Sequence, residues 1–299
     1  DADLTDRYVA NGETVTIDLN GHNLTGGTTD VLRVINDGNL TITGTGTIST
    51  KNADNTAIWL MSGGGTLTVG EGVTISAPNG NEAKGYGIGV YASGNIPATV
   101  NLNGKILGGN GLTVSGNITG GVTVNVGSTA NINVDDTGLY LAGDATTNIN
   151  GAAISGGING IEIRAGRLNV NGGSINSKAA NYEAPVSNGN GTTTKGVAIG
   201  VSPHGTEAGK NIAVTVTGGA VLSGNATENG PKQIALVATD NIADANTRSV
   251  VVTNCPAITA DKCVNTTGQA FTIDGAQVHK PAAPVTPPAD DGNNEEEGA

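Results

Sequence analysis

The sequence has few of the large side chains that fill the core of an ordinary globular domain. Its 299 residues include one Trp, one Phe and five Tyr, against 48 Gly. A compact domain of this length normally builds a wide core from large apolar residues. The composition therefore excludes a thick globular body and favours a narrow fold that Val, Ile, Leu and Ala can fill.

Long apolar runs and positive charge are also scarce. No apolar run approaches the roughly 18 residues that span a bilayer, so we expect no membrane insertion of this segment. Lys and Arg number 14 against 26 Asp and Glu, a net charge of −12. Five of the acids lie in the last ten residues, so removing their five charges from −12 leaves −7 for residues 1–289. Nucleic acid and anionic membranes are negative too and are excluded as partners.

Cysteine is almost absent, with only Cys255 and Cys263 in the segment VVVTNCPAITADKCVNT. The spacing allows one strand and a turn to bring the two thiols together, and an exported protein with so little cysteine often keeps one local disulfide. We therefore expect a Cys255–Cys263 disulfide, with two free thiols stacked in the core as the alternative. Neither interpretation provides a metal site or a nucleophile.

A three-part apolar phrase recurs along the chain every 22 to 37 residues. Its first part is a short alternation, its second resembles Leu40-Thr41-Ile42, and its third resembles Thr47-Ile48 after a Gly-rich corner. Such a period is typical of a stack of similar units. The units begin at Val31, Ala57, Gly87, Leu112, Leu139, Ile161, Val197 and Ile234, with partial units before Val31 and after Gly268.

The phrase has the period of a β-strand, because apolar residues occupy every second position, as in Leu67 and Val69 or Leu168 and Val170. Three short strands per unit, separated by Gly, Asn and Asp corners, predict an all-β parallel β-helix of about nine three-strand coils, right-handed and about 43 Å long. We assign residues 1–279 to this solenoid. Residues 280–299 are rich in proline and acid and are expected to form an extended tail or linker.

The opening turn, VTIDLNGHNLTG from Val15 to Gly26, resembles a phrase of the pectin-lyase-like superfamily of right-handed β-helices. It is most similar to the versions found in bacterial secreted and cell-surface adhesin-type β-solenoids. The resemblance covers about residues 10–279. It implies the fold and says little about activity, because β-helices carry lyases, hydrolases, spikes and inert stalks alike.

An enzyme of this architecture needs a cluster of acidic and basic side chains in a cleft. Asp135 and Asp136 are adjacent in a corner, so their side chains are expected to diverge into solvent, with a weak cation site as the alternative. Glu162 and Arg164 alternate with Ile161 and Ile163 and are expected to form an exposed ion pair on the outer face of one strand. The sequence thus indicates no catalytic residues, no metal site and no cofactor.

An aromatic stripe is the candidate binding site. Trp59 lies between Ile58 and Leu60 in a predicted strand, and its opposite parity predicts that it points outward. Tyr91 lies one unit further on, and Tyr140 two units beyond that. The three rings are expected to follow one face, where they either bind a ligand such as a sugar or cover strand surface.

The leading hypothesis is a non-enzymatic structural or adhesive solenoid, exported to the cell surface or beyond. A start at Asp1 without Met fits a chain whose signal peptide has been removed, although an artificial boundary would look the same. Self-association through the open ends, giving a head-to-tail filament, is one expected partnership. Binding of surface glycans or polysaccharide is the other, and a polysaccharide lyase or hydrolase is the remaining alternative. Specificity is expected in four insertions, Pro78–Gly85, Lys178–Lys195, Pro203–Asn211 and Asp240–Arg248.

Overall fold

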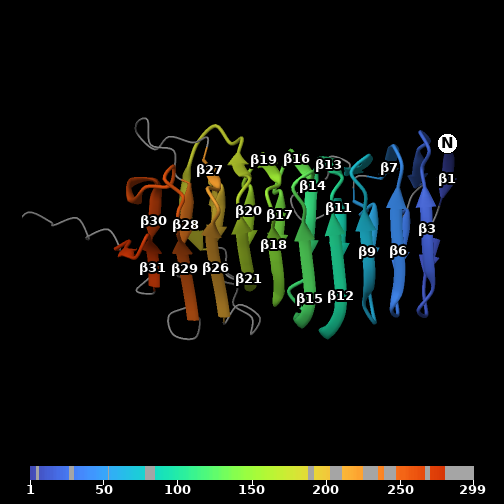
Figure 1. Ribbon diagram of the computed structural model, residues 1–299, viewed down its shortest axis with the longest axis horizontal. Helices are drawn as coiled ribbons and strands as arrows, with labels where there is room; N and C mark the ends of the chain where they lie inside the picture. Colours follow the sequence, from blue (N-terminus) through green and yellow to red (C-terminus); the bar gives the residue numbers. More distant parts are fainter. Residues whose placement is uncertain are drawn as a thin grey trace, which may run out of the picture.

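The protein is a rod of stacked coils, as the computed structural model shows (Figure 1). Successive strands of each sheet lie side by side along the rod, with β1 near the N-terminal end. The only helix in the described part of the chain is one 3-10 turn, Ala260–Lys262. The structure describes residues 1–4, 7–26, 30–52, 54–77, 85–187, 192–202, 211–224, 235–238, 247–266 and 270–279.

Three long sheets form the sides of the rod, and each coil up to β29 (Thr247–Val252) contributes one strand to each sheet. Sheet B takes the first part of the repeated phrase, sheet C the second and sheet A the third, which confirms the predicted all-β parallel β-helix. Sheet A consists of β1 (Ala2–Leu4), β4 (Leu24–Gly26), β7 (Gly46–Thr50), β10 (Val73–Ala77), β13 (Lys105–Gly108), β16 (Asn131–Val134), β19 (Ala153–Gly156), β22 (Ser174–Ser177) and β27 (Val221–Ser223).

Sheet B is built from the shortest strands. In spatial order they are β2 (Arg7–Val9), β5 (Leu32–Val34), β8 (Ile58–Leu60), β11 (Tyr86–Val90), β14 (Asn110–Val114), β17 (Leu139–Leu141), β20 (Ile161–Ile163), β25 (Ile199–Val201), β28 (Leu236–Ala238) and β30 (Cys263–Asn265).

Sheet C is parallel up to its last pair, because β32 turns back and pairs antiparallel with β31. Its strands are β3 (Thr14–Asp18), β6 (Gly38–Thr43), β9 (Gly65–Val69), β12 (Gly94–Leu102), β15 (Ile118–Val126), β18 (Ala145–Ile149), β21 (Gly166–Asn171), β26 (Asn211–Thr217), β29 (Thr247–Val252), β31 (Ala270–Ile273) and β32 (Ala276–Gln277).

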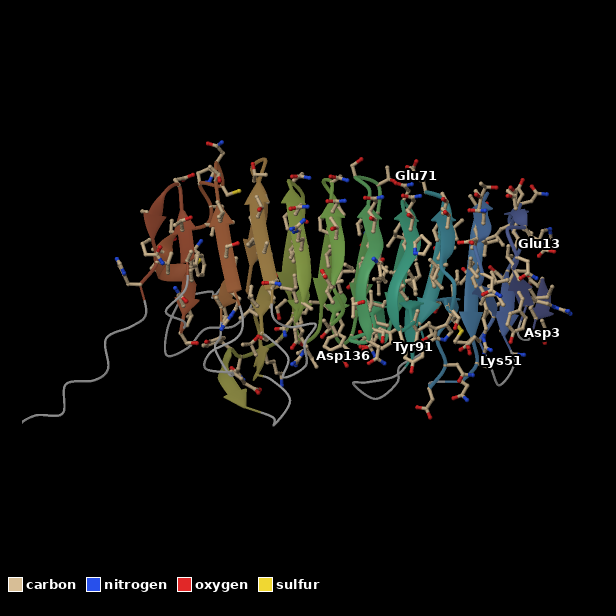
Figure 2. The ribbon with its side chains drawn as sticks, turned by 90° about the horizontal axis from the view of Figure 1, so that it is seen from below. Asp3, Glu13, Lys51, Glu71, Tyr91 and Asp136 are labelled. Atoms are coloured by element: carbon tan, nitrogen blue, oxygen red, sulfur yellow. The ribbon has the colours of Figure 1, made fainter. Side chains whose placement is uncertain are left out.

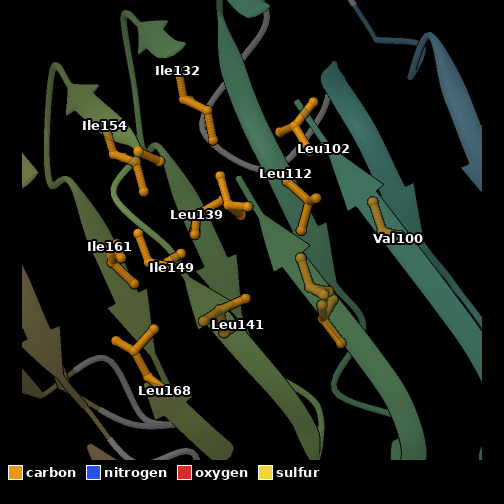
Figure 3. Close-up of a cluster of buried hydrophobic side chains, with 14 of the residues drawn as sticks. Val100, Leu102, Leu112, Ile132, Leu139, Leu141, Ile149, Ile154, Ile161 and Leu168 are labelled. Atoms are coloured by element: carbon orange, nitrogen blue, oxygen red, sulfur yellow. The ribbon is translucent and has the colours of Figure 1, made fainter. Parts of the chain in front are cut away.

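The core is a narrow column of aliphatic side chains inside the three sheets (Figure 3). Leu112 in β14 pairs in register with Leu139 in β17, and Leu139 pairs with Ile161 in β20, so similar side chains stack coil on coil. All three are fully buried. Apart from Phe271 and the two cysteines, the buried core cluster consists of Val, Ile, Leu and Ala, as the composition predicted.

An amide ladder runs along the outer face of sheet C. The Nδ2 of Asn125 donates to Oδ1 of Asn101 at 3.0 Å, and Asn148 donates to Asn125 at 2.9 Å. Asn169 continues the ladder at 2.9 Å, and Asn101 begins it by donating to the Thr68 hydroxyl at 3.4 Å. In-register parallel pairing places each amide beside the next, so the same bond repeats over four consecutive coils.

The expected disulfide is wrong, because both cysteines are free and buried. Cys255 follows β29 of sheet C, and its thiol lies 3.4 Å from the carbonyl oxygen of Thr253. Cys263 begins β30 of sheet B, where it pairs with Leu236. The chain between them continues around the coil through the Ala260–Lys262 turn, so Cys255 follows a strand of sheet C whereas Cys263 lies in a strand of sheet B.

The insertion Lys178–Lys195 contains a β-hairpin, which the sequence did not predict. Strands β23 (Glu183–Ser187) and β24 (Thr192–Lys195) are antiparallel, and an ion pair of 2.9 Å joins Glu183 to Lys195 at the base. Most of the other three insertions, and the tail at 280–299, lie outside the described residues. No helix within the described ranges is long and apolar enough to cross a membrane.

The amide ladder predicts an effect on stability. Asn125→Ala removes one donated and one accepted hydrogen bond, each with a net value of about 1 kcal/mol, so we expect a loss of about 1 to 2 kcal/mol in the free energy of unfolding. Thr123→Ala, on the same strand and the same face, is the control and should change stability by less than about 0.5 kcal/mol. Urea denaturation followed by circular dichroism measures both; equal losses would show that the ladder contributes nothing.

The buried thiols predict a lack of reactivity. Burial, with a smaller effect of Asp261, raises the pKa of Cys263 to about 12, so little thiolate forms at pH 8. We expect the native protein to resist a thiol reagent such as DTNB and to release two thiols on unfolding. A reducing agent should leave the unfolding midpoint unchanged; a lower midpoint under reducing conditions would instead indicate a bond between the two cysteines.

Candidate functional site

The predicted aromatic residues lie on the outer face of sheet B. Register pairing lines up one outward residue from each strand in a single column along the rod. In chain order the column holds Tyr8, Arg33, Trp59, Gly89, Thr113, Tyr140, Glu162, Gly200, Val237 and Val264. Trp59 and Tyr140 are therefore members of one column, three strands apart.

Trp59 rests on a glycine of the next coil. Gly89 is its direct partner in the sheet, and a Cβ at Gly89 would lie 2.1 Å from Cζ3 of the indole. Any side chain at Gly89 would therefore displace the ring. The missing side chain lets the indole lie along the rod over β11, so its position is set by the backbone beneath it.

Tyr91 completes an aromatic pair with Trp59. It follows β11 directly, and its ring centroid lies 5.9 Å from that of Trp59 with the planes at 73°, an edge-to-face contact. Tyr91 is 50% exposed, whereas Trp59 is half-buried. The two rings thus form an accessible apolar corner on an otherwise polar surface. Figure 2 shows Tyr91 and Asp136 on the same side of the rod.

Two tyrosines of this face each have an arginine guanidinium stacked on the ring. The Arg33 guanidinium lies 5.6 Å from the centre of the Tyr8 ring, and the Arg164 guanidinium lies 5.5 Å from that of Tyr140. Arg33 also pairs with Asp30 at 2.7 Å, close to solvent. An arginine on a tyrosine ring gains a cation–π attraction that is stronger where water is excluded.

Glu162 and Arg164 form an ion pair, but the prediction that it is exposed is wrong. Arg164 Nη2 lies 2.7 Å from Glu162 Oε1, and the two side chains are only 3% and 7% exposed. Burial raises the pKa of Glu162, while Arg164 opposes the rise. Burial likewise raises the pKa of Tyr140. The pair is therefore a component of a covered, low-dielectric region.

The β23–β24 hairpin explains why this part of the face is covered. A Cβ at Gly200, the sheet partner of Glu162, would lie 2.6 Å from Oγ1 of Thr194 in β24, so the hairpin lies directly on the column. Asn159 fixes its base by donating to the Thr194 carbonyl at 2.7 Å and accepting from the Val197 amide at 3.3 Å. Tyr182, Val197 and Val237 form a small apolar cluster beneath it.

The outer face of sheet B is thus divided into an open half and a covered half. The open half carries Tyr8, Trp59 and Tyr91, and the covered half carries Glu162, Arg164 and Gly200. Tyr86 and Thr113 lie near the boundary; their hydroxyls share a hydrogen bond, and burial followed by nearby Tyr140 raises the pKa of Tyr86. The sequence identified the aromatic residues and did not identify Gly89 or Thr113. Alignment of the units could have found Gly89, as a glycine at the outward position next to a tryptophan.

The acidic corner residues have different partners, but only Asp135 is exposed as predicted, because Asp136 is half-buried. Asp135 lies 3.9 Å from the Lys178 ammonium, whereas Asp136 accepts a hydrogen bond of 3.2 Å from the Thr137 hydroxyl. Among the described residues, no three His, Cys, Asp or Glu side chains gather closely enough to hold a metal ion. The arrangement offers an aromatic contact surface and a buried ion pair, and it does not place a free acid beside a free base.

Comparison with known proteins gives no match: no family model fits the chain, and no curated protein or solved structure is significantly similar to it.

The buried ion pair predicts a pH-dependent loss of stability in Arg164→Met. The substitution leaves the Glu162 carboxylate buried without a cation, a change that typically costs about 3 to 5 kcal/mol. Because Arg164 opposes the rise in the Glu162 pKa, its removal raises that pKa further above the unfolded value of 4.5. A carboxyl whose pKa is higher in the folded than in the unfolded protein stabilises the fold at pH values below its unfolded-state pKa. This stabilisation is lost as the pH rises through its folded-state pKa.

We therefore expect Arg164→Met to be much less destabilised at pH 4 than at pH 8 in urea denaturation. Arg33→Met is the matched control, because Arg33 also stacks on a tyrosine and pairs with an aspartate but is more exposed. Its loss should be smaller at both pH values. Equal destabilisation of Arg164→Met at pH 4 and pH 8 would contradict the assignment of the pH effect to Glu162.

Proposed function

We propose that the protein is a non-enzymatic, adhesive β-solenoid that binds carbohydrate with the open half of the outer face of sheet B. The observation that carries the proposal is the Trp59–Tyr91 corner on its glycine support. An indole that rests on Gly89, with Tyr91 at its edge, presents apolar ring surface at the outside of the rod. The weakly polar C–H face of a sugar ring is a good partner for such a surface, because contact removes both from water.

The rest of the open half suits a polar, extended ligand. Arg33 and Asp30 lie two coils from Gly89 and Tyr8 lies three coils from it, and together they offer donors and acceptors; the Tyr8 hydroxyl accepts a hydrogen bond of 2.9 Å from Arg33. A rigid parallel sheet holds these groups at fixed spacing, which lowers the entropic cost of binding. A neutral glycan is favoured over an acidic one by the net charge of −12.

The lyase or hydrolase alternative receives less support. Glu162, the carboxyl with the raised pKa, is bonded to Arg164 and lies beneath the hairpin. A general acid has to reach its substrate directly or through one water. The filament alternative is also less supported, since β32 occupies the free edge of β31 at the end of sheet C.

The proposal includes a right-handed coil, membership of the pectin-lyase-like superfamily and an extracellular or cell-surface location. Right-handed crossovers are strongly preferred between parallel strands of one sheet. The phrase VTIDLNGHNLTG supports the superfamily, because it folds as β3 and β4 of a regular coil. The location rests on the sequence alone.

The single tryptophan makes the proposal directly testable. Titration with a panel of neutral oligosaccharides, such as cello-, chito- and malto-oligosaccharides, should change the fluorescence of Trp59 with a dissociation constant in the micromolar to millimolar range. Calorimetry should show binding at least about tenfold weaker in Trp59→Ala and clearly weaker in Tyr91→Ala, because removal of one ring forfeits a buried contact of about 1 to 3 kcal/mol.

Leu107→Ala is the control, because Leu107 is a 38% exposed apolar residue of sheet A and lies on a different side of the rod. It should bind like the unaltered protein. A panel without any binder, or a binder that Trp59→Ala retains in full, would rule the proposed site out.

A further inference from the structure

A hollow on the outer face of sheet C is separate from the aromatic site. It has a volume of about 370 Å³ and lies over four consecutive strands, β18, β21, β26 and β29, which follow one another along the rod in Figure 1. Small-molecule sites in proteins commonly begin at about this size. The lining consists of Asp144, Thr146, Gly166, Arg167, Asn211, Ile212, Ala213 and Ser249.

The hollow exists because one column of outward side chains is interrupted. Thr146 pairs with Arg167, Arg167 with Ala213, and Ala213 with Ser249, so the four outward side chains lie in line. The methyl group of Ala213 is much shorter than its arginine neighbour and leaves a depression above β26. Ile212 also borders the hollow, but its side chain points into the core.

Two opposite charges line this hollow without pairing. Within the described residues, the guanidinium of Arg167 and the carboxylate of Asp144 make no hydrogen bond and no ion pair, with each other or with any other group. Other charged neighbours on this rod do combine, as Lys51 does with Asp3 at 3.2 Å and Lys195 with Glu183 at 2.9 Å. A cation and an anion that line the same open hollow without pairing are complementary to a ligand that carries both charges.

We propose that this hollow binds a small zwitterion, a free α-amino acid, with its carboxylate on Arg167 and its ammonium group on Asp144. A guanidinium can donate two parallel hydrogen bonds to a carboxylate, and an ammonium group donates to a carboxylate oxygen in the same charge-assisted way. The hydroxyls of Thr146 and Ser249 and the amide of Asn211 supply further hydrogen-bonding groups at the rim. The ligand side chain lies over Ala213.

Charge and lining both favour a zwitterion over other ligands. A simple anion would satisfy Arg167 but would approach a protein with a net charge of −12, next to Asp144. A simple cation would leave Arg167 unused. Among the described residues, the lining contains no aromatic ring, so this part of it lacks the stacking surface on which the proposed glycan site depends. The two sites are therefore chemically distinct, and neither proposal rests on the other.

Calorimetry on the full chain with L-serine and L-alanine, alongside acetate and ethylammonium as ligands with a single charge, tests the proposal. We expect both amino acids to bind with dissociation constants in the millimolar range or below, and each singly charged ligand to bind at least about tenfold more weakly. Arg167→Gln and Asp144→Asn should each weaken amino-acid binding at least about tenfold. Ala213→Leu should abolish it by filling the hollow while leaving both charges in place.

Lys105→Gln is the control for loss of one surface charge, because Lys105 is an exposed residue of β13 in sheet A. It should bind amino acids normally, as should Trp59→Ala. Thermal unfolding of each variant shows that the fold is retained, which is expected because Arg167 and Asp144 are exposed. The proposal would be overturned if neither amino acid bound at concentrations up to about 20 mM, or if acetate bound as tightly as alanine. Unchanged amino-acid binding by Ala213→Leu would also overturn it.

Discussion

In-register hydrogen bonding between parallel strands of successive coils is the constraint on which the whole rod depends. When Leu40 lies beside Leu67 and Ile42 beside Val69, each inward side chain must match the one below it, and every outward side chain is fixed in a column as well. The aliphatic core, the amide ladder of sheet C and the aromatic column of sheet B are three consequences of this register. A one-residue slip would turn the core of that strand toward solvent, so the register that builds the core also places the surface groups.

The inside of the rod was predictable because its pattern is local and repeated. Alternation at Leu67 and Val69 or at Leu168 and Val170 is sufficient to identify strand and inward face, and eight repeats make chance agreement negligible. The same parity correctly placed Trp59 on the outside. Parity says nothing, however, about what lies over an outward residue. Glu162 and Arg164 were predicted to be solvated, and only the position of the β23–β24 hairpin shows that they are buried.

The cysteine error has a related physical origin. Seven residues lie between Cys255 and Cys263, a spacing at which a hairpin would bring two thiols together. In a β-helix the same length of chain passes around a corner from one sheet to another. This is because each strand pairs with a strand of the previous coil and does not pair with the strand that precedes it in the sequence. Short sequence separation therefore implies proximity less often in a solenoid than in an antiparallel sheet.

Columns also explain where sites arise on such a surface. A column that loses a side chain creates space directly above a rigid backbone, and a neighbouring group can occupy that space. Gly89 is covered by the indole of Trp59, and Gly200 is covered by Thr194 of the hairpin. Ala213 is the corresponding position on sheet C, and the hollow above it is lined, within the described part of the chain, by charged groups that have no partner. The gap at Gly89 supports the aromatic pair, and the gap at Gly200 accommodates the hairpin. The gap at Ala213 forms the hollow proposed to bind a ligand.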